Sequence, residues 1–455
     1  MGQVAVRFLA DFVEGLPEAP ATSFDSADAA DGAGTRPATD LLRPPPEDSG
    51  EFPALLDEFR RAAEQAMETA GPGYMAYIPG GGLFTSALAE MLARTFNRYT
   101  ALADMAPALV AMEDSVLRWL GGQFGFPDGA TGLLTTGGSM ATLSAIVAAR
   151  YDRLGEHFSD GTLYVTNHSH HCVAKAAHIA GLPMARIRTV PTTEHLRMDP
   201  TAAAEMIAAD RAAGLRPFLL VGTAGTTDTG AIDPLDELAE LTRRERLWFH
   251  VDGAYGGFFQ LTGRGRSAFA GIDAADSLVL DPHKGLFLPY GTGALVVHDA
   301  ATLRGAHAGG GHYLQDLDPG GDLPDYAHLG PELTREFRGL RLWLPLHLHG
   351  VAAFRDALDE KLDLAARAHR ALADDPLLDV PWEPDLSVVA FRLRHGDDTD
   401  NQRLLERINA TQRIVLSSTR IDGRFILRLC ILSHRTHADR LTEAFDIIHA
   451  AARQT

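Results

Sequence analysis

Short apolar runs alternate with helical segments between about residues 130 and 300. Runs of four or five apolar residues without alternating polar positions are typical of strands that are buried on both faces. A capping Asp before Pro, as in Asp199-Pro200 and Asp233-Pro234, predicts the first turn of a helix. Alternating strands and helices predict a largely parallel sheet covered by helices on both faces. The expected strands are residues 163–166, 218–222, 247–251, 277–281 and 294–298.

The pattern changes on both sides of this region. Residues 15–50 are rich in Ala, Pro, Asp and Gly and show no apolar period, which is typical of a loose segment. Apolar residues at helical spacing from Phe52 to Met67 predict a helix, with Pro53 in its first turn. A Leu- and Ala-rich helical stretch follows Trp343. Beyond it we expect strands at 387–393 and 424–432 and helices at 401–410 and 438–452.

These patterns predict four parts of the chain. They are a flexible arm (1–50), an N-terminal helical segment (51–95), a large domain (96–345) and a small α+β domain (346–455). Because ligands of parallel α/β sheets bind at the carboxyl ends of the strands, we look for chemistry at those ends.

Composition narrows the class of protein. The 455 residues are 45% hydrophobic and 22% charged, as in an ordinary globular protein, and the formal net charge of −19 disfavours nucleic acid and anionic membranes as partners. No apolar run is long enough to span a bilayer, and Arg7 and Asp11 interrupt the stretch where a signal peptide would be apolar. We therefore expect a cytoplasmic protein that acts on a small molecule. Two cysteines, Cys172 and Cys430, cannot form a disulfide framework.

Lysine is rare in this chain, since only Lys175, Lys284 and Lys361 are found among 41 basic residues. Lys284 lies in Asp281-Pro282-His283-Lys284-Gly285, directly after a predicted buried strand. A primary amine at this position can condense with an aldehyde, and pyridoxal phosphate is the aldehyde cofactor that uses this reaction. A surface lysine after a strand is the structural alternative.

A second predicted strand ends in His250-Val251-Asp252-Gly253-Ala254-Tyr255, which places the Asp252 carboxylate at the same edge of the sheet. Such an anion keeps a pyridine nitrogen protonated, so that the ring can accept electrons. Gly137-Gly138-Ser139 precedes a predicted helix, whose N-terminal N–H groups favour a phosphate. The Gly-Gly-Ser segment is weak on its own and lacks the P-loop lysine and the dinucleotide glycine pattern.

Three histidines, His168, His170 and His171, leave two interpretations open. Alternate residues of an extended segment can bind one metal ion, which would favour a metal-dependent hydrolase. We prefer His170 as a flat partner for an aromatic cofactor ring, because no third ligand and no supporting carboxylates stand out. A non-catalytic binding protein would leave Lys284, Asp252 and His170 without a common explanation.

At this point the chain resembles the group II pyridoxal-phosphate decarboxylases, the aromatic L-amino-acid decarboxylase family of fold type I, over nearly its whole length after residue 50. The motifs that carry the resemblance occur in the family's order and spacing. They are residues 71–79 (GPGYMAYIP), Gly137-Gly138-Ser139, Ser169-His170-His171, 223–227 (TAGTT), 250–255 (HVDGAY), Asp281-Pro282-His283-Lys284 and 337–341 (FRGLR).

The resemblance implies an aspartate aminotransferase-like large domain with a mostly parallel seven-stranded sheet, and an intertwined homodimer with active sites at the subunit interface. It implies that Lys284 carries pyridoxal 5'-phosphate and that Asp252 pairs with the ring nitrogen. His170 would stack on one face of the ring, Ala254 would pack on the other, and Thr227 would lie near its polar edge. Gly138, Ser139 and His283 would hold the phosphate.

The resemblance also implies residues for substrate and catalysis. Arg428 matches the family's arginine near the substrate carboxylate, and Tyr313 matches the tyrosine of the mobile catalytic loop, the expected proton donor. Tyr77, Ile78 and Tyr99 would form the substrate wall and favour an aromatic or large aliphatic side chain. The expected reaction is α-decarboxylation of such an L-amino acid to its amine.

Several positions depart from the family pattern. Gly285 stands where many relatives have Trp, Asp281 where the aromatic decarboxylases have Asn, and residues 80–82, Ala101 and Ala103 are smaller than the usual substrate wall. These departures leave the identity of the substrate open. An aldehyde synthase and an aminotransferase are alternative reactions within the same cofactor class. Retention of Tyr313 and His170 favours the simple decarboxylase.

Overall fold

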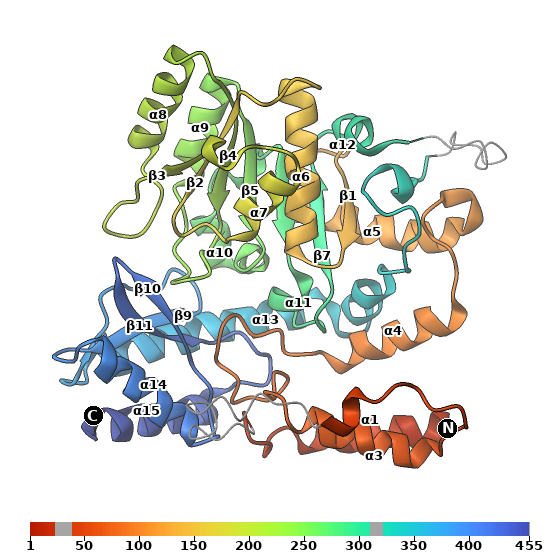
Figure 1. Cartoon of the computed structure of the whole chain (residues 1–455), viewed down its shortest axis with the longest axis vertical. Coiled ribbons are helices and arrows are strands. Elements are labelled where there is room, and N and C mark those ends of the chain that lie inside the picture. Colours follow the sequence, from red (N-terminus) through yellow and green to blue (C-terminus); the bar gives the residue numbers. More distant parts are fainter. Residues whose placement is uncertain (23–38, 310–321, 455) are drawn as a thin grey trace. The chain divides into compact units, whose positions relative to one another are not determined.

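The computed structural model describes residues 1–22, 39–309 and 322–454 (Figure 1). It contains two compact units, one made of Met1–Gly81 with Asp363–Thr455 and the other of Gly82–Leu362. The predicted boundaries at residues 95 and 345 do not coincide with these units. The reason is backbone pairing far along the chain: the Met75 N–H donates to the Val415 carbonyl (3.0 Å), and the Cys430 N–H donates to the Met75 carbonyl (3.0 Å).

The Gly82–Leu362 unit is built on a seven-stranded sheet in the order β1-β7-β6-β5-β4-β2-β3. The pairs among β6, β5, β4, β2 and β3 are parallel, whereas β7 runs antiparallel to both β1 and β6. The predicted mostly parallel sheet is confirmed. The strands are β1 (Thr131–Thr135), β2 (Gly161–Thr166), β3 (Ile187–Val190), β4 (Arg216–Thr223), β5 (Trp248–Gly253), β6 (Ser277–Leu280) and β7 (Gly293–Val297).

The helices of this unit are α4 (Phe84–Phe96), α5 (Pro107–Gln123), α6 (Gly138–Leu154), α7 (Cys172–Ile179), α8 (Pro200–Ala212), α9 (Leu235–Glu245), α10 (Gly263–Ala268), α11 (Pro282–Gly285), α12 (Ala300–His307) and α13 (Leu340–Ala373), which continues past the end of the unit. Of these, α5, α6, α8, α9 and α11 contact strands of the sheet, and α6 lies against it in Figure 1. A backbone break at Gly350 (φ 75°) divides α13.

One of the two predicted capping aspartates caps a helix and the other does not. The Asp199 carboxylate accepts from the N–H groups of Thr201 and Ala202 at the start of α8. The Asp233 carboxylate, by contrast, accepts from the N–H groups of Met198 (2.7 Å) and Thr223 (2.8 Å). The prediction for Asp233 was wrong, because its buried carboxylate instead joins the segment at Met198 to the end of β4. Burial raises the pKa of Asp233 to about 6.

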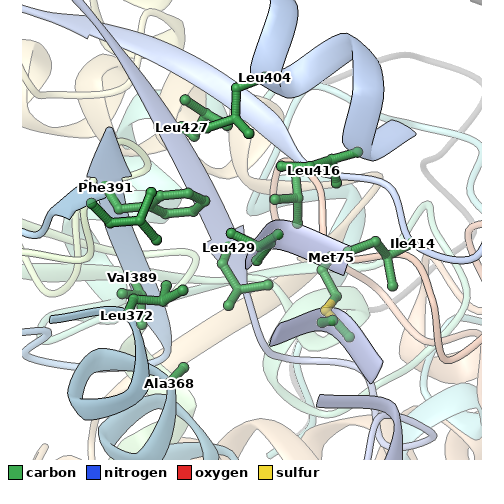
Figure 2. Close-up of a cluster of buried hydrophobic side chains, with 14 of the residues drawn as sticks. Met75, Ala368, Leu372, Val389, Phe391, Leu404, Ile414, Leu416, Leu427 and Leu429 are labelled. Atoms are coloured by element: carbon green, nitrogen blue, oxygen red, sulfur yellow. The ribbon is translucent and has the colours of Figure 1, made fainter. Parts of the chain in front are cut away.

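The other unit contains an antiparallel four-stranded sheet in the order β10-β11-β9-β8. Figure 2 shows its core, where Met75 from the N-terminal segment lies among side chains such as Phe391 and Leu429. The elements are β8 (Leu378–Asp379), β9 (Val388–Leu393), α14 (Asp398–Ala410), β10 (Ser417–Ile421), β11 (Arg424–Cys430) and α15 (Ala438–Arg453).

The N-terminal segment of this unit differs from the predicted arm. Gly2–Gly15 forms helix α1, so the arm does not begin at residue 1. The helix was missed because its apolar residues, such as Phe8 and Phe12, follow a helical period that the arm's composition obscured. The predicted helix at Phe52 is present as α3 (Phe52–Ala63), and none of its residues is buried. Within the described residues, no helix is long and apolar enough to cross a membrane.

Candidate active site

A cavity of about 260 Å³ lies where β4, β5 and β6 end and where α6 and α7 begin. This is the sheet edge at which ligands of parallel α/β folds bind. All eight residues that the sequence predicted to contact the cofactor line it. They are Gly138, Ser139, His170, Thr227, Asp252, Ala254, His283 and Lys284.

The Lys284 ammonium projects from α11 and lies 2.9 Å from Oδ2 of Asp281. Burial acts to lower the pKa of Lys284, but attraction by the Asp281 and Asp252 carboxylates, together with the hydrogen bond to Asp281, raises it overall. The other carboxylate oxygen of Asp281, Oδ1, is buried and has no hydrogen-bond partner among the described residues. Lys284 is therefore held as a charged group at the cavity wall.

The Asp252 carboxylate is at the end of β5, in the part of the strand that is fully buried. Its Oδ1 accepts from the Ala254 N–H (3.0 Å), which fixes the side chain at the cavity wall. On the neighbouring strand Thr223 is the register partner of Asp252, and it also lines the cavity. The sequence had not singled out Thr223, although it opens the predicted TAGTT motif.

The start of α6 at Gly137 and Gly138, which we call the glycine cradle, has space for an anion the size of a phosphate. The N-cap residue Gly137 has φ 151° and provides no capping side chain, and the first turn contains no acidic residue. A Cβ added to Gly138 would lie 2.9 Å from Oδ2 of Asp281 and 3.3 Å from Cβ of Ala254. Only glycine leaves this space free, so the backbone N–H groups and positive end of α6 can approach an anion.

His283 faces this cradle from α11. Its Nδ1 lies 2.7 Å from the Thr292 carbonyl oxygen, and because a carbonyl only accepts, Nδ1 carries a proton. Its Nε2 is thereby the nitrogen available to the cavity. Thr292 is supported in turn by Arg341, which donates to its hydroxyl (3.3 Å) and to the Gly291 carbonyl (3.0 Å).

His170 lines the cavity where the chain enters α7. The Cys172 N–H donates to its Nδ1 (3.3 Å), which places the proton of the neutral ring on Nε2. Burial lowers the pKa of His170, with Asp252 acting in the opposite direction. Cys172, which the sequence had not predicted here, also lines the cavity, and burial raises the pKa of its thiol to about 12, so it remains uncharged.

The predicted substrate residues do not line this cavity. Tyr77, Ile78 and Arg428 belong to the unit that contains the four-stranded sheet. There the buried Arg428 guanidinium donates to the Ser417 hydroxyl (2.9 Å) and to the Tyr77 carbonyl (3.1 Å). The Tyr99 hydroxyl donates to the Leu333 carbonyl (2.7 Å). Tyr313 lies outside the described residues.

The alternative metal site finds no support among the residues that the structure describes. None of their His, Cys, Asp and Glu side chains form a group of three that could hold a metal ion. His168 instead pairs with Asp228, its Nδ1 lying 3.3 Å from Oδ2.

The cavity fits pyridoxal phosphate. A half-buried lysine, a carboxylate fixed on an adjacent strand, a glycine cradle at a helix N-terminus and a neutral histidine converge on one space. Together with the α/β fold they define an enzyme dependent on this cofactor. The pyridoxal-dependent decarboxylase conserved domain matches residues 40–394. The chain belongs to this family, pyridoxal phosphate is its cofactor, and it is a carboxy-lyase.

Three known proteins illustrate what the chain is similar to. It is 32% identical over 418 residues to an aromatic-L-amino-acid decarboxylase of Bacillus atrophaeus, covering 90% of this chain and 87% of that protein. The structure of Oryza sativa TDC with pyridoxal phosphate and tryptamine matches with a TM-score of 0.91 and 26% identity over 99% and 96% of the two chains. A Rhodiola rosea 4-hydroxyphenylacetaldehyde synthase shares the fold, with a TM-score of 0.89 and 23% identity over 100% and 97% of the chains.

Proposed function

We propose that this enzyme removes the α-carboxylate of an aromatic L-amino acid and releases the corresponding amine. The observation that carries the proposal is the convergence of Lys284, Asp252 and His170 on one cavity. The names of the similar proteins, an aromatic-L-amino-acid decarboxylase and a complex with tryptamine, support an aromatic side chain. A large aliphatic side chain is the other class that the sequence favours.

Bound pyridoxal phosphate supplies an electron sink for the pair left on Cα when the bond to the carboxylate breaks. In our proposal Lys284 carries the cofactor, and Asp252 keeps the ring nitrogen protonated. His170 packs against one face of the ring and Ala254 against the other. Thr227 lies near the polar edge of the ring.

The phosphate is held, in this proposal, by Gly138, Ser139 and His283. The helix N-terminus contributes N–H groups and a positive end, and the His283 Nε2 faces the same anion. These contacts would fix the position of the cofactor in the cavity. Geometry at the cavity then selects decarboxylation among the reactions that the cofactor supports.

Tyr313 is the residue that we propose returns a proton to Cα. A phenol can donate one proton at an otherwise dry carbon. Arg428, Tyr77, Ile78 and Tyr99 remain candidates for contacts to the substrate. If Tyr313 did not act in this way, the exposed carbon would react with dioxygen and the product would be an aldehyde.

We propose that the active enzyme is a homodimer. The supporting observation is a set of exposed apolar side chains on helices α1 and α3, where Phe8 and Phe59 approach each other with ring centroids 6.4 Å apart. Exposed apolar patches of this kind favour a partner surface. The exposed side chains include Val4, Leu9, Phe12, Leu55 and Phe59.

The decisive experiment incubates the purified protein and pyridoxal phosphate with each of the twenty amino acids. Products are identified by mass, with oxygen consumption recorded at the same time. An amine from tryptophan, tyrosine or phenylalanine without oxygen uptake supports the proposal. An aldehyde with peroxide would instead establish an aldehyde synthase, and keto-acid formation would establish an aminotransferase.

A further inference from the structure

Arg341 is a buried arginine in the first turn of α13, and the proposed chemistry does not use it directly. Its guanidinium pairs with two carboxylates, at 2.6 and 2.8 Å. The same guanidinium also donates to the Gly291 carbonyl (3.0 Å) and to the Thr292 hydroxyl (3.3 Å). Arg341 therefore holds residues 290–293 at the entry to β7, which we call the 290–293 segment.

The 290–293 segment contacts the His283 side chain twice. The Thr292 carbonyl accepts from Nδ1 of His283 (2.7 Å), and the Tyr290 ring lies edge-on to the imidazole, with ring centroids 5.7 Å apart. The Asp281 carboxylate also approaches Nδ1, but at 3.7 Å it is beyond hydrogen-bond range. The Thr292 carbonyl is therefore the acceptor that fixes the orientation of the His283 ring.

The same segment lies against the glycine cradle. A Cβ added to Gly293 would lie 2.6 Å from Cα of Gly137, so only glycine allows the two backbones to approach this closely. A Cβ added to Gly137 would in turn lie 3.7 Å from Cε1 of His283, the ring carbon between the two nitrogens. The ring that the 290–293 segment orients is thus next to the space assigned to the phosphate.

Hydrogen bonds from Arg341 replace side-chain packing at this point of the segment. Gly291 has no side chain, its φ is 92°, and a Cβ built on it would have no atom within 4 Å. Backbone with few packing contacts opens easily unless other interactions hold it. A guanidinium is suited to this task, because its rigid fork of donors binds several acceptors at once. Loss of these bonds would free the segment, and the Thr292 carbonyl would move with it.

We propose that Arg341 is a positioning residue for recognition of the cofactor phosphate. By fixing the 290–293 segment it holds the Thr292 carbonyl, and through this carbonyl it holds the His283 ring beside the glycine cradle. The inference rests on the role of His283 in the proposed function. It predicts that Arg341 acts on binding of the phosphate group and not on binding of the pyridine ring or the aldehyde.

The test compares two aldehydes, pyridoxal 5'-phosphate and pyridoxal, which differ in the phosphate group. The cofactor is removed from the full-length protein, and the affinity for each aldehyde is measured by visible absorbance. Arg341→Met should weaken binding of pyridoxal phosphate at least about tenfold, the usual size for loss of a group that orients a ligand-binding side chain. Its affinity for pyridoxal should not change. An equal loss of both affinities would mean that Arg341 only supports the fold, and would overturn the proposal.

Arg335→Met is the matched control for this comparison. Arg335 is also a buried arginine, but it donates to Glu113 and to the Leu134 carbonyl instead of the 290–293 segment. Its replacement should lower the melting temperature of the cofactor-free protein and leave the ratio of the two affinities unchanged. A lowered ratio in Arg335→Met would show that loss of stability alone produces the effect, which would overturn the proposal.

Parallel measurements on His283→Ala separate the two ways of failing. If His283→Ala keeps the wild-type preference for pyridoxal phosphate, the assigned role of His283 fails and this inference fails with it. If His283→Ala loses the preference but Arg341→Met keeps it, Arg341 does not position His283. The double variant should bind pyridoxal phosphate as His283→Ala does, because Arg341 acts through His283. A further loss in the double variant would contradict that route.

A second substitution decides the question if Arg341→Met does not fold. Arg341→Lys keeps a positive charge for the two carboxylates but lacks the guanidinium fork that also binds the 290–293 segment. A lowered ratio of the two affinities in Arg341→Lys supports the proposal, and a wild-type ratio overturns it.

Discussion

Two regions of the Gly82–Leu362 unit bury charged side chains, and they differ in how those charges are paired. The first is an arginine cluster made of Glu90, Glu113, Glu332, Glu336, Arg335, Arg338 and Arg341. Each of its carboxylates lies within 3.3 Å of an arginine, and the Arg335–Glu113 pair (2.5 Å) is almost completely buried. The second region is the cavity, where one oxygen of Asp281 is buried without a hydrogen-bond partner among the described residues.

The two regions differ in how their carboxylates are paired, although Nε and Nη1 of Arg335 in the cluster are also buried without hydrogen-bond partners among the described residues. In the arginine cluster each carboxylate charge is neutralised locally, and Arg335 and Arg338 also donate to the Leu134 carbonyl on β1. Glu113 receives the Gly339 N–H (3.0 Å) as well. Charges in the cavity are paired only in part, which costs stability unless a ligand completes the pairing. The predictions below test this difference.

Replacing Lys284 should have the largest effect on activity. Lys284→Ala removes the only amine in the cavity lining, so we expect decarboxylation to fall by more than about a thousandfold, because a covalent catalytic step is lost. Borohydride reduction followed by peptide mapping should label Lys284 in the wild type. The exposed Lys175→Ala variant should keep both the label and the activity, and a label on Lys175 or Lys361 would contradict the assignment.

Breaking the arginine cluster should affect stability instead. Arg335→Met leaves the Glu113 carboxylate buried without its cation, which we expect to cost about 3 to 5 kcal/mol of unfolding free energy. Urea denaturation measures the loss. Arg60→Met, which breaks an exposed pair with Asp57, should cost less than about 1 kcal/mol. If Arg335→Met is as stable as Arg60→Met, the cluster does not support the fold.

The double variant Glu113→Gln with Arg335→Met tests whether the unpaired Glu113 charge causes the loss of stability. Gln retains an acceptor for the Gly339 N–H but carries no charge. The double variant should therefore be more stable than Arg335→Met alone, because no unpaired charge stays buried. Equal stability would show that lost packing, and not the unpaired charge, causes the damage.

Tyr313→Phe should change the product more than the binding. We expect amine formation to fall by about a hundredfold or more, the usual contribution of a general acid, and turnover to shift toward aldehyde, ammonia and peroxide. Product mass and oxygen uptake are the measurements, and the exposed Tyr151→Phe is the control. Amine production at the wild-type rate without oxygen uptake would exclude Tyr313 as the proton donor. His170 and His312 would then be the candidate donors.

Asp281→Asn should have the smallest effect of these variants. It should change how the rate of pyridoxal phosphate binding depends on pH. The Asp281 carboxylate raises the pKa of Lys284, so their ion pair stabilises the cofactor-free protein below pH 10.5 and is lost only as the pH rises through the raised pKa. Without that carboxylate, burial lowers the pKa of Lys284, and each unit of decrease gives about tenfold more neutral amine at pH 7. Stopped-flow absorbance should show faster capture of pyridoxal phosphate at neutral pH.

The matched control for this variant is Asp273→Asn, which changes an exposed carboxylate in the short 3-10 helix Ile272–Ala274. Its capture rate should equal that of the wild type at each pH. A rate that is unchanged in Asp281→Asn would mean that the ion pair does not control the protonation of Lys284.

The sequence by itself determined the strand-and-helix alternation and predicted eight residues that the structure brings together around one cavity. Strands that are buried on both faces have continuous apolar sequences. For this reason the sequence predicted five strands close to their observed bounds, namely β2, β4, β5, β6 and β7. Lys284 and Asp252 follow such runs, and the ends of parallel strands meet at one edge. Short-range pattern was enough to bring these two residues together.

Tertiary structure alone decided the contacts that join distant segments. Met75 enters the core of a sheet formed after residue 377, and no local pattern marks a strand-like contact across more than 300 residues. The sequence around Asp233 predicts a helix cap, but its carboxylate accepts from the N–H groups of Met198 and of Thr223 at the end of β4. Side-chain packing also decides that Asp281 pairs with Lys284, and that Nε2 of His250 is buried without a hydrogen-bond partner among the described residues. Burial and the positions of neighbouring charges exist only once the chain has folded.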